Sequence, residues 1–131
     1  MITVDTHIII WDALKPDELS AKAKKAIDKA NKKEGIIICE ISLWEIAMLI
    51  KKKRLIIKIP FLEFIELILS SKNYILKGIS PEIAELSVVL PDNINQDPAD
   101  RIICATSLIN NSPLVTADKN LIQSKMIRTI W

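Results

Sequence analysis

The chain has 131 residues, half of them hydrophobic, and a formal net charge of +2 at pH 7. This length predicts a single domain, residues 1–131, that can bury a core without disulfide or metal staples. The net charge is too small to indicate nucleic-acid binding by itself. The uncharged run 102–117 is too short for a membrane span and contains Asn-Asn-Ser-Pro.

The amino terminus, MITVDTHIII, has no basic residues ahead of its apolar ones and carries Asp5 and His7 among them. It therefore lacks the pattern of a secretory signal, and we expect a cytoplasmic protein. Cys39 and Cys104 lie in apolar segments and form no CxxC pair, which predicts buried thiols rather than a disulfide or a metal site. The high apolar content also favours an interface with a subunit or another partner.

The first third of the chain predicts a strand followed by two helices. Ile2–Val4 is a short strand closed by Asp5, and Thr6–Trp11 begins a short helix. A longer helix over 20–33 is capped by Ser20, has a narrow apolar stripe between lysines, and ends at Gly35.

The segment that follows predicts a buried strand and a buried helix. Ile36–Cys39 is a continuous β-branched run, as expected of a central parallel strand covered on both faces. Ser42 and Glu45 have the spacing of a capping box, and Leu43–Lys53 is a helix apolar nearly all round. Such a helix is expected to be buried on more than one side.

The middle of the chain continues the alternation. Helix 61–70 is followed by strand 74–76 and by helix 80–90, in which Ser80 is the N-cap and Pro81 the first helical residue. A loop over 91–96 leads to the next helix.

That helix carries an acid on its buried side. Asp97 is a good N-cap, Pro98 suits the first helical position, and the helix runs toward Asn110. Helical spacing places Asp100 on the face that also carries Ile103, Cys104 and Ser107. Asp100 therefore lies at the N-terminal end of the helix face that packs inward.

The last elements are a short interior strand over 114–116 with Asp118 just past its carboxyl end, a helix over 119–124, and an edge strand over 126–130. Strands alternating with helices predict right-handed βαβ units and a three-layer α/β/α sandwich with a mainly parallel sheet. No Gly-rich phosphate loop is present, which argues against P-loop or Rossmann nucleotide binding.

Four acids fall on the same predicted rim of the sheet: Asp5, Glu45, Asp100 and Asp118. In open α/β sheets, ligands bind beyond the carboxyl ends of the strands. Carboxylates gathered there repel one another unless a cation joins them, and hard oxygen ligands suit Mg²⁺ or Mn²⁺. Such a site favours hydrolysis of a phosphoester.

Each acid also has a purely structural interpretation. Glu45 also fits the role of partner to Ser42 in the capping box alone. Asp100 fits a first-turn acid that favours the helix dipole, Asp118 a cap of the last helix, and Asp5 a turn former after its strand. Asp97 is interpreted as a cap alone. The convergence of four acids on one rim supports the functional interpretation.

Several motifs in order resemble a known family: VDTHIIIW, SLWEIAMLIKKKRL, DPADRIICATS and LVTADKNL, with a closing Trp131. The chain resembles PIN-domain ribonucleases of the VapC toxin type over nearly its whole length. The resemblance implies a metal-dependent endoribonuclease, with Asp5 and Asp100 as the firmest metal ligands and Glu45 and Asp118 completing the cluster. Thr116 matches a polar position beside the last acid, and Ala99 replaces a common aromatic.

The resemblance further implies the toxin of a toxin–antitoxin pair, with an RNA substrate, a cognate antitoxin, a homodimer and no membrane partner. It leaves open which RNA is cut, which antitoxin binds and how many metal ions act.

Other residues keep two interpretations. The basic run Lys51–Arg54 fits either a solvated helix end or a contact with RNA phosphates. His7 fits a packed neighbour of Asp5 better than a general base. Trp11 and Trp44 are expected in the core or an interface, with base stacking as the second possibility.

Three other classes of protein fit the sequence less well. A phosphoacceptor receiver domain requires an acidic pair after its first strand, but Thr6 follows Asp5 here. Haloacid-dehalogenase chemistry wants an Asp where His7 stands. The remaining alternative is a catalytically silent PIN fold that binds RNA or protein, against which the four intact acids speak.

Overall fold

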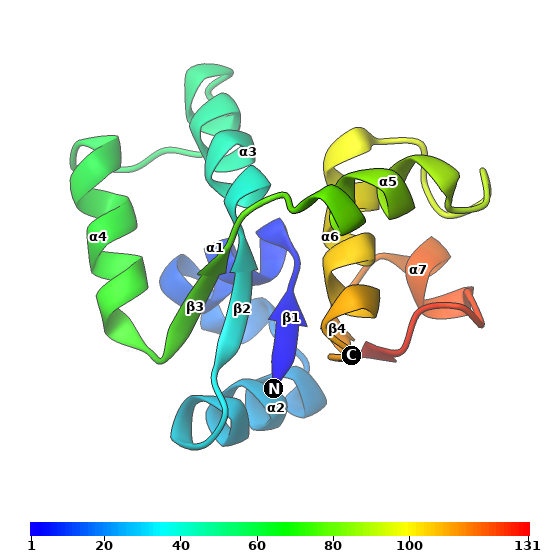
Figure 1. The fold of residues 1–131 in the computed structure, drawn as a ribbon. Helices are drawn as coiled ribbons and strands as arrows, with labels where there is room; N and C mark the ends of the chain where they lie inside the picture. Colours follow the sequence, from blue (N-terminus) through cyan, green and yellow to red (C-terminus); the bar gives the residue numbers. More distant parts are fainter.

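A computed structural model describes residues 1–131 and contains one five-stranded sheet in the order β3-β2-β1-β4-β5 (Figure 1). The strands are β1 Ile2–Val4, β2 Ile36–Cys39, β3 Tyr74–Lys77, β4 Leu114–Val115 and β5 Thr129–Ile130. All four neighbouring pairs are parallel. In the register of the central strand, Val4 is paired with Ile38 on one side and with Val115 on the other.

Seven α-helices and one 3₁₀ turn connect the strands: α1 Thr6–Leu14, η1 Pro16–Glu18, α2 Ala21–Lys32, α3 Glu40–Lys51, α4 Phe61–Ser71, α5 Pro81–Val89, α6 Pro98–Ile109 and α7 Lys119–Gln123. Buried side chains form two hydrophobic clusters, one with α1, α2 and α4, the other with α5, α6 and α7. Val115 belongs to the first cluster and Leu114 to the second, because successive strand residues face opposite sides of a sheet. The predicted α/β/α sandwich is confirmed.

Most of the predicted helix ends are confirmed by hydrogen bonds. The hydroxyl of Ser20 accepts from Ala23 N at 3.1 Å, and that of Ser80 accepts from Ile83 N at 3.2 Å. Gly35 ends α2 with a φ of +103°, a left-handed conformation that favours glycine. The two cysteines are free and buried, as expected.

The predicted capping box is wrong. Helix α3 begins at Glu40 with Cys39 as N-cap and has no side-chain cap, because β2 runs directly into the helix. Ser42 is buried inside α3, and its hydroxyl is 2.9 Å from that of Thr6. The hydroxyl of Ser42 therefore contacts Thr6, which is distant in the sequence, and does not cap its own helix.

Two further expectations need correction. Only Ser42 and Ile46 of α3 are buried and Trp44 is 58% exposed, because the helix projects beyond the sheet (Figure 1). The last strand is shorter than predicted, since only Thr129 and Ile130 pair with β4 while residues 125–127 form a bend. None of the helices combines the length and apolar character needed to cross a membrane.

Candidate metal centre

A cavity of about 370 Å³ opens beyond the carboxyl ends of β1 and β4. Its lining includes five carboxylates: Asp5, Glu45, Asp97, Asp100 and Asp118. The structure thus brings the four acids singled out from the sequence into one cavity. Asp97, which was expected only to cap a helix, is the fifth.

Two neighbouring strands position Asp5 and Asp118. Asp5 directly follows β1, and its Oδ1 accepts from Ile8 N at 3.1 Å as the cap of α1. Its other oxygen, Oδ2, accepts from the hydroxyl of Thr116, which follows β4. The same hydroxyl oxygen accepts from Asp118 N at 3.1 Å, and Asp118 caps α7 through Leu121 N at 3.1 Å. Thr116 therefore links the two acids.

Two helices bring the remaining acids. Glu45 of α3 accepts from the hydroxyl of Thr6 at the start of α1, and not from Ser42 as a capping box requires. Asp97 caps α6 with its Oδ1, 2.9 Å from Ala99 N, and Asp100 lies in the first turn. Glu45, Asp97 and Asp100 each contribute one carboxylate oxygen to a group of three that lie within 4.8 Å of one another.

Asn95 bridges two of the acids. Its side-chain nitrogen donates to Asp100 Oδ2 at 3.1 Å and to Asp118 Oδ2 at 2.9 Å. Its side-chain oxygen accepts from Asn120 Nδ2 at 2.6 Å, which fixes the orientation of the amide. Sequence reasoning missed Asn95, because a loop residue that joins distant segments leaves no periodic pattern.

Arg101 holds the loop that carries Asn95. Its guanidinium donates to six backbone carbonyls: those of Ser87, Val88, Leu90, Pro91, Ile94 and Asn95. The contact with Asn95 O is 3.0 Å long. These carbonyls, and no carboxylate, accept the hydrogen bonds of the Arg101 guanidinium. The hydrogen bonds hold the loop that carries Asn95 next to the acids.

Burial is the main cause that raises the pKa of three of these carboxylates, Asp5, Glu45 and Asp100. Burial raises the pKa of Asp5 above its ordinary value, and burial likewise raises the pKa of Glu45. For Asp100, burial followed by the charge of Asp97 raises the pKa to about 6. No lysine or arginine lines the cavity. A divalent cation fits this donor set, since it prefers carboxylate oxygens and offsets their repulsion.

Aromatic side chains lie at the edge of the cavity. His7 is exposed, and its ring centroid is 5.9 Å from that of Trp11; both residues line the cavity. Trp11 in turn packs against Trp131 at 5.9 Å. Trp44 lies outside this group and is exposed, so it is not part of the core, and its place in an interface stays a prediction. The basic run Lys51–Arg54 is also exposed.

Comparisons with known proteins agree with this architecture. A family model described as PIN domain matches residues 2–125. Ribonuclease VapC22 of Mycobacterium tuberculosis (strain ATCC 25618 / H37Rv) is 32% identical over 132 residues, which cover 99% of this chain and 98% of the relative.

Two solved structures share the fold. A toxin-antitoxin complex from Klebsiella pneumoniae matches with a TM-score of 0.65 and 23% identity, over 96% of this chain and 94% of that one. VapBC2 from Rickettsia felis, bound to a DNA fragment from its promoter, matches with a TM-score of 0.67 and 16% identity, over 98% and 97% of the two chains. With the family match over nearly the whole length, the chain belongs to the PIN domain family.

Proposed function

We propose that this protein is a Mg²⁺-dependent endoribonuclease, the toxin of a toxin–antitoxin pair that a cognate antitoxin protein inhibits. The observation that carries the proposal is the single cavity lined by carboxylates from α3, from α6 and its N-cap, and from the segments that follow β1 and β4. The name of the relative that is 32% identical, a ribonuclease, supports the choice of substrate.

Asp5, Glu45, Asp100 and Asp118 are the proposed ligands of Mg²⁺, with Mn²⁺ as a plausible substitute. When bound, the cation supplies a water of lowered pKa and neutralises charge that develops on the phosphodiester. The chain's part is to hold the carboxylates in place. Thr116 fixes one oxygen of Asp5, and Thr6 fixes one oxygen of Glu45. These hydrogen bonds hold both carboxylates at the cavity, as supporting residues do for metal ligands.

Cleavage of a labelled RNA with and without Mg²⁺ tests the proposal. Asp5→Asn and Asp100→Asn should each lower the cleavage rate by about a hundredfold or more while circular dichroism shows a folded protein. Asp92→Asn, an exposed acid outside this cavity, is the matched control and should cleave normally. Normal cleavage by Asp5→Asn or Asp100→Asn would refute the assignment. A wild-type protein that neither binds Mn²⁺ nor cleaves would instead be a silent binding module.

We also propose that the protein forms a homodimer. Exposed apolar side chains such as Trp44 on α3 and Val88 and Val89 on α5 support an additional interface. Light scattering at micromolar concentration should give twice the monomer mass, and a strictly monomeric species would remove this part of the proposal.

A further inference from the structure

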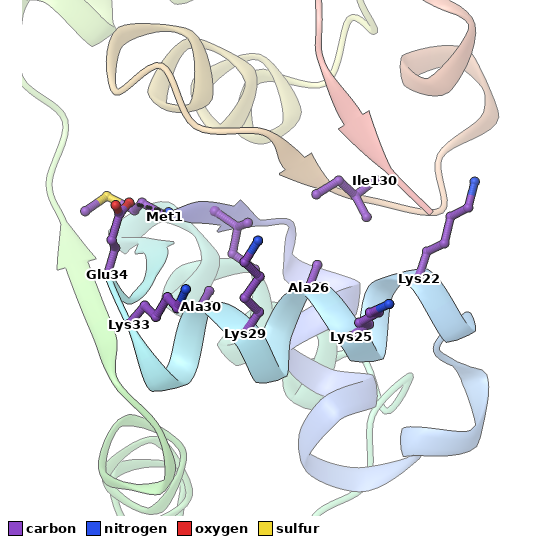
Figure 2. A pocket seen from close by; sticks show the side chains of 10 residues that line it. Met1, Lys22, Lys25, Ala26, Lys29, Ala30, Lys33, Glu34 and Ile130 are labelled. Carbon is purple, nitrogen blue, oxygen red and sulfur yellow. Dashed lines mark hydrogen bonds and ion pairs between the residues drawn. The ribbon is translucent and has the colours of Figure 1, made fainter.

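A second and larger cavity, of about 660 Å³, lies at the opposite end of β1 from the acids. It opens between α2 and the strands β1 and β5, and we call it the α2 lysine groove (Figure 2). Met1 and Ile2 line it at the start of β1, whereas Asp5 follows the end of that strand. The groove is therefore separate from the proposed catalytic cavity.

Four lysines line this groove: Lys22, Lys25, Lys29 and Lys33. Their spacing of three or four residues places them in one row along α2 (Figure 2). The ion pairs of the chain are Met1–Glu34, Lys32–Asp28 and Lys72–Asp12. None of the four lysines of the row therefore has a carboxylate oxygen within 4.0 Å. The one carboxylate that lines the groove, Glu34, is paired with the terminal ammonium of Met1 at 2.7 Å, so the row keeps a net positive charge.

The groove has an apolar floor below a row of charged side chains. Ile2 and Ala30 in the floor are each only 6% exposed, whereas Met1 at the start of β1 is 42% exposed. The lining has no aromatic residue on which a base could stack. The four lysine ammonium groups are the main charges of the groove, and their regular spacing suits the evenly spaced charges of a phosphodiester backbone.

We propose that the α2 lysine groove binds the phosphodiester backbone of nucleic acid without reading its sequence. From Lys22 to Lys33 the row extends over about 16 Å of helix, enough for several phosphates. Resting on the proposed function, the groove would hold one part of a long RNA while another part enters the acidic cavity. Short RNAs would reach only the acids.

Binding measured in EDTA, with cleavage excluded, tests the groove directly. The probe is a labelled single-stranded RNA of 30 nucleotides, titrated at several salt concentrations. Lys22→Gln/Lys29→Gln should weaken binding and reduce the slope of log K against log[salt] by about 1.4, since each phosphate contact on a single strand contributes about 0.7. The matched control is Lys24→Gln/Lys32→Gln, two exposed lysines of the same helix that do not line the groove. Equal losses in the two double variants, or no loss in either, would overturn the proposal.

Two other probes distinguish the chemistry of the ligand. A single-stranded DNA of equal length should lose the same share of affinity in Lys22→Gln/Lys29→Gln, because the proposed contacts are to phosphates alone. A loss confined to RNA would contradict a site that reads only phosphates. Polyglutamate should compete poorly with RNA, and better competition by polyglutamate than by DNA would make the groove an acidic-peptide site.

Cleavage kinetics then separate this proposal from the proposed nuclease activity. Lys22→Gln/Lys29→Gln should raise KM several-fold for the 30-nucleotide RNA, leave kcat unchanged, and leave cleavage of a six-nucleotide RNA as in wild type. Equal effects on both substrates would overturn the role in holding long RNA. If the wild type cleaves nothing, the nuclease proposal fails, while binding in EDTA still decides whether the groove takes nucleic acid.

Discussion

Asn95 donates from its side-chain nitrogen to Asp118 Oδ2 at 2.9 Å, and the same nitrogen lies 3.1 Å from Asp100 Oδ2. A neutral amide thereby satisfies two acids that repel each other. The oxygen of the amide is occupied by Asn120, so the amide cannot reverse without losing that hydrogen bond. Asn95 is thus a positioning residue for the acid cluster.

Asn95→Ala should lower the free energy of unfolding in EDTA by about 1–3 kcal/mol, because two carboxylates lose their donor and because alanine is disfavoured at the φ of +37° that Asn95 adopts. Saturating Mn²⁺ should reduce this difference, since the cation takes over the neutralisation. Urea unfolding with EDTA and with Mn²⁺ measures both quantities. Asn93→Ala is the control, because Asn93 takes part only through its backbone carbonyl. Equal stability of the two variants in EDTA would contradict this role of Asn95.

The pKa of Asp100 predicts a dependence of stability on pH. Its ordinary value of 3.8 is raised to about 6 in the folded protein, so the folded state favours the protonated form. The stability that this group contributes is complete below pH 3.8 and is lost as the pH rises through about 6.

Asp100→Asn should therefore be more stable than the metal-free wild type at pH 7 by about 1–2 kcal/mol, with a smaller difference at pH 4. The asparagine oxygen still accepts from Asn95, so the comparison isolates the charge. Urea unfolding in EDTA at the two pH values measures it. A difference that stays constant with pH would show that the charge of Asp100 costs the fold nothing.

The fold followed from the sequence because its signals are local. The apolar run Ile36–Cys39 became an inner strand, and the capping residues Ser20, Ser80 and Asp97 began helices where expected. A local pattern gave a wrong prediction where the side chain bonds to a distant segment of the chain. Ser42 had the spacing of a cap, but its hydroxyl meets Thr6.

The candidate site was partly predictable for the same reason. Acids that follow strands meet at one edge of a parallel sheet, so the sequence alone predicts that Asp5 and Asp118 lie close together. Asn95 and Arg101 could not be placed, because their partners are defined only by the path of the 87–95 segment around them. Asp97 was assigned one role although its second oxygen is free for another.

Arg101→Lys should destabilise the protein by about 2–4 kcal/mol, because a single ammonium cannot reach the carbonyls that the planar guanidinium satisfies. Hydrogen exchange should increase most in the loop over 91–96. Arg128→Lys is the control, since Arg128 is exposed and donates to one carbonyl, that of Asn111, at 3.2 Å. Similar losses in the two variants would count against the proposed role of Arg101.

Thr116→Val keeps the shape of a fully buried side chain but removes the hydroxyl that donates to Asp5. We expect Mn²⁺ affinity and the rate of RNA cleavage each to fall by about 10- to 100-fold, as when other supports of metal ligands are removed. Thr116→Ser restores the hydroxyl and should restore most of both. The pH at which Mn²⁺ binding is half-maximal should also rise in Thr116→Val, because Asp5 loses a hydrogen bond that lowers its pKa. If the pH of half-maximal Mn²⁺ binding is unchanged in Thr116→Val, Thr116 contributes only to packing.

The most direct test of the central claim is the anomalous diffraction of a crystal soaked in Mn²⁺. The proposed arrangement of acids predicts a peak in the cavity at about 2.0–2.4 Å from oxygens of Asp5 and Asp100, and no such peak in Asp100→Asn. A crystal of active protein with no peak among these carboxylates, or with its peak elsewhere, would contradict a metal centre at this edge of the sheet.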